Sequence, residues 1–165
     1  MDLANKYRPQ KLEDIVGQEN VVKILSSELK HNKLRQQYLF VGNTGSGKTT
    51  TARILAKAVN GQVLEIDAAS HSSVEDIRAL IETITIRPMG VDHTVVILDE
   101  VHGLSNKAIQ TLLLTLEKPP KHVIFILCTT EADKVPDTIK NRCECFIFLR
   151  LPYYLIADRL EYICK

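Results

Sequence analysis

A glycine-rich segment in the N-terminal half carries the clearest chemistry. Residues 42–49, GNTGSGKT, fit the pattern G-x-x-x-x-G-K-[ST] without a mismatch. In this pattern the glycines let backbone N–H groups surround phosphate oxygens, the lysine places a cation on them, and the final hydroxyl completes a Mg²⁺ shell. Lys48 is therefore expected to be catalytic and Thr49 to be a metal ligand. The predicted nucleotide contacts are Gly42, Asn43, Thr44, Gly45, Ser46, Gly47, Lys48, Thr49 and Thr50.

Two adjacent carboxylates, Asp99 and Glu100, follow an apolar run at residues 94–98. Open α/β sheets bind ligands at the carboxyl ends of their strands. Asp99 is therefore predicted to hold Mg²⁺, directly or through water, and Glu100 to orient and deprotonate the attacking water. A solvated acidic turn is the alternative for this pair alone, and the phosphate loop in the same chain disfavours it. Together the two motifs predict hydrolysis of ATP with Mg²⁺ as cofactor.

The elements that must position these groups alternate between strands and helices. Apolar runs predict strands at residues 38–41, 63–66, 94–98, 123–128 and 145–149. Helical periodicity marks 22–29, 50–59, 74–84 and 109–116, with Ser73 and Ser105 as N-caps. A strand before the loop and a helix after it also disfavour the simpler reading, a glycine-rich turn with an exposed lysine.

Continuous apolar runs are typical of parallel strands covered on both faces. We therefore expect an α/β fold, a three-layer α/β/α P-loop NTPase with a five-stranded parallel sheet. The strand at 63–66 lies between the two motifs and indicates the additional-strand type of P-loop ATPase. Residues 1–151 would form the nucleotide-binding domain. Residues 152–165 would begin a lid helix, with the rest of a lid and a collar domain absent.

Composition limits the class of protein. The chain has 165 residues, 45% of them apolar, and a formal net charge of +1, so a DNA-binding surface would have to be local. No signal peptide is expected, because residues 1–9 are polar and lack an apolar run. No membrane span is expected, because no apolar run approaches the ~18 residues that a span needs. The four cysteines form no C-x-x-C pair, which predicts reduced thiols in the cytoplasm.

Several further motifs resemble one family. Residues 6–10 (KYRPQ) and 14–19 (DIVGQE) are similar to the N-terminal signature of clamp-loader AAA+ ATPases. DEVH at 99–102, LEKPP at 116–120, TTE at 129–131 and NRC at 141–143 resemble motifs of the gamma/tau subunits of bacterial DNA polymerase III. The resemblance runs from about residue 4 to 152, with the motifs in the same order.

The resemblance implies roles for seven more residues. Tyr7, Arg8, Pro9, Val16 and Gly17 match the segment that lines the adenine pocket, Thr130 matches the first sensor, and Arg142 matches an arginine finger that acts in trans on a neighbouring subunit's ATP. Without the family, Tyr7 and Pro9 would be surface turn residues and Arg142 a surface arginine. The implied partners are other clamp-loader subunits in a pentameric ring, a sliding clamp and primer-template DNA.

The chain also departs from the family pattern. Asn60-Gly61-Gln62 directly joins two elements between which the family carries a cysteine-rich zinc module, so no zinc is predicted. The family usually has Asn-Arg-Gly where this chain has His71-Ser72-Ser73, so an arginine expected near the DNA-facing side is missing, and His71 could partly replace it. Leu114 stands where a lysine is common, and Asn141 where a serine is usual.

The function expected from all of this is that of an ATPase, the motor subunit of a replicative clamp loader and hence a subunit of a DNA-directed DNA polymerase. Two alternatives remain: a non-hydrolysing structural subunit of the same assembly, and another AAA+ DNA-processing ATPase such as a branch-migration helicase.

Overall fold

The computed structural model describes residues 6–164. Its centre is a sheet of five parallel strands in the order β2-β3-β4-β1-β5. The strands are β1 (Gln37–Gly42), β2 (Gly61–Asp67), β3 (His93–Asp99), β4 (Val123–Thr129) and β5 (Glu144–Phe148). The helices are α2 (Glu19–Lys30), α3 (Lys48–Ala58), α4 (Val74–Thr85), α5 (Asn106–Glu117), α6 (Asp137–Lys140) and α7 (Tyr153–Cys164). Short 3₁₀ turns are η1 (Leu12–Asp14), η2 (Val101–Gly103) and η3 (Ala132–Lys134).

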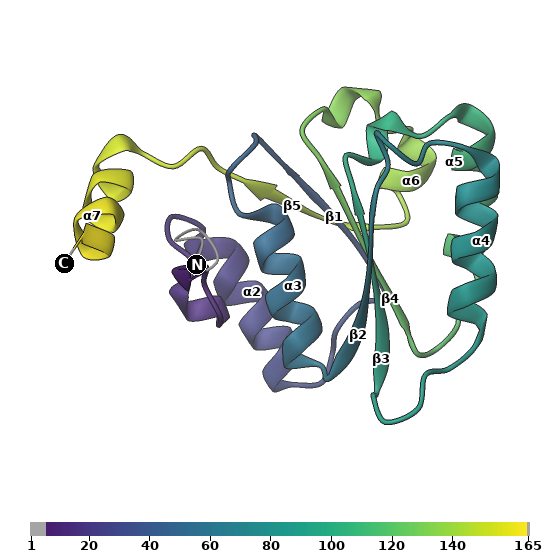
Figure 1. Cartoon of the computed structure of the whole chain (residues 1–165), viewed down its shortest axis with the longest axis horizontal. Coiled ribbons are helices and arrows are strands. Elements are labelled where there is room, and N and C mark those ends of the chain that lie inside the picture. Colours follow the sequence, from purple (N-terminus) through teal and green to yellow (C-terminus); the bar gives the residue numbers. More distant parts are fainter. Residues whose placement is uncertain (1–5, 165) are drawn as a thin grey trace.

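Helices cover both faces of the sheet, as the continuous apolar strands require (Figure 1). On one face α2 and α3 pack over a core that includes Leu25, Phe40 and Leu55. On the other face α4 and α5 pack over a core that includes Ile77 and Leu112. Each fully buried leucine or phenylalanine contributes about 1.5–3 kcal/mol of transfer free energy, so both helical layers stabilise the sheet. The expected three-layer α/β/α fold is confirmed.

The predicted caps of two helices are confirmed. The Ser73 hydroxyl accepts from the Asp76 N–H at 3.1 Å, and the Asp76 carboxylate accepts from the Ser73 N–H at 3.2 Å, which closes a reciprocal capping box on α4. The Ser105 hydroxyl accepts from the Ala108 N–H at 3.2 Å at the start of α5.

Most predicted boundaries differ from the observed ones by one to three residues, and for two of them the structure gives a physical reason. The helix after the loop begins at Lys48, not at residue 50, because Gly47 takes a left-handed φ of 100° and turns the chain into the helix at once. Strand β5 ends at Phe148, because the Leu149 N–H donates to the Gln18 side chain at 3.0 Å.

The last helix, α7, has no buried residue and lies apart from the sheet, joined to β5 by an extended segment (Figure 1). It contacts the N-terminal segment, where the Arg159 guanidinium donates to the Tyr7 carbonyl at 2.9 Å. Within residues 6–164 no helix combines the length and the apolarity that crossing a membrane requires.

Candidate active site

The glycine-rich loop lies between the end of β1 and the start of α3. Gly45 and Gly47 have φ values of 78° and 100°, which L side chains rarely adopt, so these two glycines allow the loop to curl. No side chain caps α3, and its first N–H groups therefore remain available at the positive end of the helix dipole. This geometry suits an anionic phosphate group.

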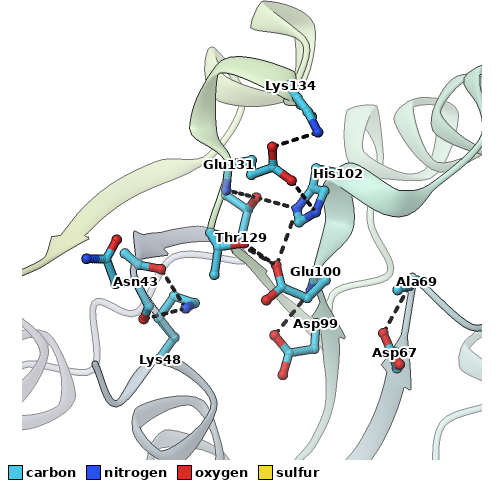
Figure 2. Close-up of polar contacts among 12 residues, drawn as sticks. Asn43, Lys48, Asp67, Ala69, Asp99, Glu100, His102, Thr129, Glu131 and Lys134 are labelled. Carbon is cyan, nitrogen blue, oxygen red and sulfur yellow. Dashed lines mark hydrogen bonds and ion pairs between the residues drawn. The ribbon is translucent and has the colours of Figure 1, made fainter. Parts of the chain in front are cut away.

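The Lys48 side chain bonds to the backbone at the start of the glycine-rich loop. Its side chain is buried, and the ammonium donates to the carbonyls of Gly42 at 2.7 Å and Asn43 at 3.1 Å (Figure 2). The hydroxyl of Ser46 is buried and has no hydrogen-bond partner among the described residues. The buried Lys48 cation and the uncapped N–H groups at the start of α3 fit the oxygens of a polyphosphate.

Thr49 and Asp99 are brought together from two elements. The Thr49 hydroxyl, in the first turn of α3, donates to Asp99 Oδ2 at 2.8 Å, although 50 positions separate the two residues. A hydroxyl and a carboxylate are hard oxygen donors of the kind that Mg²⁺ prefers, and Mg²⁺ usually keeps several waters besides. The pair therefore fits the predicted metal site.

Glu100 and Thr130 are also in direct contact. The backbone N–H and the hydroxyl of Thr130 both donate to Glu100 Oε2, at 3.1 and 3.0 Å. Glu100 has a left-handed φ of 49°, a strained conformation for a residue other than glycine. The turn directs its carboxylate toward the end of β4, where Thr130 follows.

A cavity of about 210 Å³ adjoins the loop where an adenine is expected. Of the residues predicted for the adenine pocket, Pro9 and Val16 line it, together with Gly45, Gly47 and Thr50. Leu151 and Arg159 close it from the segment around α7.

The other three predicted adenine-pocket residues are not part of that lining. The Tyr7 ring packs edge-on against Tyr162, with centroids 6.4 Å apart. The Arg8 carbonyl accepts from the Gln10 side chain at 3.1 Å. A Cβ on Gly17 would clash with the Leu151 side chain, so this glycine permits close packing against the segment that leads into α7. Their predicted roles remain predictions.

Arg142 has no hydrogen bond or ion pair with residues 42–50 in the described part of the chain. Its guanidinium donates to the Thr138 carbonyl and to Glu117 Oε1, both at 2.7 Å. It follows α6, and an action on a neighbouring subunit remains a prediction.

Sequence reasoning missed Gln18 as a site residue. Its side chain is 3% exposed and donates to the carbonyls of Ser46 at 3.2 Å and Leu149 at 2.7 Å. It also accepts from the Leu149 N–H at 3.0 Å, and so joins the phosphate loop to the segment that leads to α7. Gln18 belongs to the DIVGQE motif at residues 14–19, but the motif does not indicate these bonds, because both partners lie far away in the sequence.

The described cysteines are all free thiols. Burial raises the pKa of Cys128 well above its ordinary value and that of Cys143 to about 12, so neither forms a thiolate near neutral pH. The prediction that the chain binds no zinc stays a prediction.

A strand, a phosphate loop and a helix, with a second strand ending in Asp99 and Glu100, define a P-loop nucleoside triphosphatase. Residues 38–151 match the family described as "ATPase family associated with various cellular activities (AAA)". The chain belongs to this family, and it is an ATPase domain by both its fold and its site.

Curated relatives narrow the similarity. The chain is 42% identical to DNA polymerase III subunit tau of Bacillus subtilis, covering 98% of this chain and 33% of that protein. It is 39% identical to subunit tau of Escherichia coli, covering 98% and 29%, and 37% identical to subunit gamma of Buchnera aphidicola from Acyrthosiphon pisum, covering 96% and 53%. The chain thus spans about a third to a half of the length of these relatives.

Solved structures agree on the fold. The Holliday junction branch migration motor RuvB of Thermotoga maritima superposes with a TM-score of 0.76 at 22% identity, over 94% of this chain and 53% of that one. A DNA polymerase III gamma subunit-related protein of the same organism superposes with a TM-score of 0.63 at 19% identity, over 79% and 47%.

Proposed function

We propose that this chain is the ATP-hydrolysing motor of a replicative clamp loader, which loads a sliding clamp onto primer-template DNA. The observation that carries the proposal is 37–42% identity over nearly the whole chain to DNA polymerase III gamma and tau subunits. The assembled pairs Thr49–Asp99 and Glu100–Thr130 support hydrolysis, as opposed to nucleotide holding by a structural subunit.

Each residue has a proposed step. Lys48 leaves its two carbonyl partners and binds the β- and γ-phosphate oxygens of ATP. Thr49 and Asp99 would hold Mg²⁺, which when bound supplies charge neutralisation to the phosphates. Glu100 orients and deprotonates the attacking water, while Thr130 senses the γ-phosphate or that water through its contact with Glu100.

The proposed assembly completes the site. Arg142 would stabilise charge on the ATP of a neighbouring subunit in a pentameric ring, and Pro9 and Val16 would contact the adenine. ATP binding would order the ring so that it opens the clamp, and primed DNA would trigger hydrolysis and release. Bound DNA and clamp would therefore raise the rate of hydrolysis.

The test is the ATPase rate of the full-length protein, with and without its partner subunits, clamp and primed DNA. Stimulation by clamp and primed DNA is expected, and Glu100→Gln should lower the stimulated rate by roughly 10²–10⁴-fold. Arg142→Ala should lower the rate at the neighbouring subunit's site, whereas Arg78→Ala, an exposed arginine on α4, should not.

Three results would separate the alternatives. No hydrolysis by an intact assembly, with nucleotide still bound, would identify a structural subunit. Stimulation by branched DNA but not by clamp and primed DNA would identify a different DNA-processing ATPase. Hydrolysis that is indifferent to both Glu100→Gln and Arg142→Ala would refute the residue roles.

A further inference from the structure

The imidazole of His102 lies between the ends of β3 and β4, beside the carboxylate of Glu100 (Figure 2). Its side chain is only 17% exposed. Nδ1 lies 2.9 Å from the Thr129 hydroxyl oxygen and 3.3 Å from Glu100 Oε2. Nε2 lies 3.1 Å from Glu131 Oε1 on the opposite side of the ring. Both ring nitrogens are therefore engaged, and the ring has one well-defined orientation.

The backbone places the ring there by a tight turn. After Asp99 the chain reverses through the left-handed residue Glu100, and the Gly103 N–H donates to the Glu100 carbonyl at 2.8 Å. A Cβ on Gly103 would lie 3.0 Å from the Ala69 Cα, so the turn presses directly on the segment after β2. The turn thus places the His102 side chain against Glu100, the residue at which the turn begins.

The contacts around Glu100 are unequal between its two oxygens. Oε2 accepts from the Thr130 N–H at 3.1 Å and the Thr130 hydroxyl at 3.0 Å, and it faces His102 Nδ1. Oε1 makes no hydrogen bond or ion pair within the described residues 6–164. One carboxylate oxygen is therefore held, while the other is open to accept a proton from water.

The contacts of His102 belong to a row of four side chains: Lys134, Glu131, His102 and Glu100. Lys134 lies 2.6 Å from Glu131 Oε2, and its hydrogen bond, with a smaller contribution from His102, holds the pKa of Glu131 below its ordinary value. Glu131 thus faces one side of the ring and Glu100 the other, while the hydrogen bond of Nδ1 is with the Thr129 hydroxyl. The residues Lys134, Glu131, His102 and Glu100 therefore form a continuous row of contacts that ends on Glu100 Oε2.

We propose that His102 is a positioning residue for hydrolysis: through Nδ1 it holds Glu100 Oε2 at the end of β4, so that Oε1 is presented to the attacking water. The inference rests on the proposed role of Glu100 as the base. His102 itself touches neither ATP nor the water. Its removal should therefore slow the chemical step and leave ATP binding unchanged.

Two near-isosteric variants separate this role from simple packing. The amide nitrogen of His102→Asn can replace Nδ1 beside Glu100, whereas that of His102→Gln can replace Nε2 beside Glu131. We expect His102→Ala and His102→Gln to lower kcat about 10-fold or more, in the range found when groups that orient a catalytic residue are removed. His102→Asn should keep at least about a third of the wild-type rate, and ATP affinity should stay within about 2-fold throughout.

The measurement is single-turnover ATP hydrolysis by the full-length protein in its assembly, with ATP affinity measured in parallel. His31→Ala, an exposed histidine after α2, is the matched control and should match the wild type. In a Glu100→Gln background, His102→Ala should add less than about 2-fold.

Equal losses for the Asn and Gln variants would overturn the inference, as would a wild-type rate for His102→Ala or a loss confined to ATP affinity. If the wild-type assembly binds ATP but does not hydrolyse it, the proposed function fails first, and the inference fails with it.

Discussion

Replacing Gln18 tests whether the buried link between the phosphate loop and the α7 segment stabilises the fold. Gln18→Ala removes three hydrogen bonds, which join its side chain to Ser46 and Leu149 at 2.7–3.2 Å. At a net value of about 1 kcal/mol each, the loss is about 3 kcal/mol. Water can reach Leu149, which is 61% exposed, and this recovers part of the loss, whereas the emptied buried volume adds to it. We therefore expect Gln18→Ala to lower the free energy of unfolding by about 2–4 kcal/mol.

Gln18→Glu makes the test specific to the donors. It keeps the shape and the acceptor for the Leu149 N–H, but it places a second oxygen against two carbonyls. The free energy of unfolding should therefore fall at least as far as in the alanine variant. Gln110→Ala, an exposed glutamine on α5, is the control and should stay within about 0.5 kcal/mol of the wild type.

The assay is urea unfolding of the three variants and the wild type, with thermal unfolding in parallel, both followed by circular dichroism. For a chain of this length the melting temperature of Gln18→Ala should fall by roughly 5–15 °C. A free energy of unfolding for Gln18→Ala within 0.5 kcal/mol of the wild-type value would refute the stabilising role of Gln18. A large loss in Gln18→Ala together with a wild-type value for Gln18→Glu would show that volume, not hydrogen bonding, is responsible.

Three further predictions concern separate parts of the molecule. Lys48→Ala should remove the stabilisation by saturating ATP, about 2.7 kcal/mol at 100 times the Kd, measured by thermal shift. Ser73→Ala should cost about 1 kcal/mol at pH 7; because Ser73 lowers the pKa of Asp76, this loss should shrink as the pH falls below about 4, measured by unfolding at each pH. Gly103→Ala should cost about 1–3 kcal/mol, because its Cβ would lie 3.0 Å from the Ala69 backbone.

The fold was predictable because its signals are local. The run ending at Asp99 and the fully buried β4 are continuous apolar segments, which a sheet covered on both faces requires. The phosphate loop was predictable for the same reason, since its glycines, lysine and hydroxyl are consecutive in the sequence. Boundaries were less predictable, because Leu149 leaves the sheet through a bond to a side chain 131 residues away.

The supporting contacts of the site were not predictable, because they join distant segments. Gln18 lies between a glycine and a glutamate, and nothing in that sequence indicates that it bonds Leu149. His102 is visible beside Glu100, but its contact with Thr129 arises only when β3 and β4 are neighbours and the turn at Glu100 is left-handed. Sheet order and backbone conformation decide such contacts, and residue type alone does not.

The contacts of Arg142 bear on its proposed action in trans. The guanidinium is held by Glu117 and by the Thr138 carbonyl, and its side chain is 33% exposed while that of Glu117 is 51% exposed. Ion pairs this accessible to water are worth about 0–1 kcal/mol. A polyphosphate on a neighbouring subunit carries more negative charge than one carboxylate and accepts bidentate bonds from a guanidinium. The contact with Glu117 therefore orients Arg142 but is too weak to keep its guanidinium from binding the ATP of a neighbouring subunit. Whether Arg142 acts in trans would then depend on whether a neighbouring subunit is present.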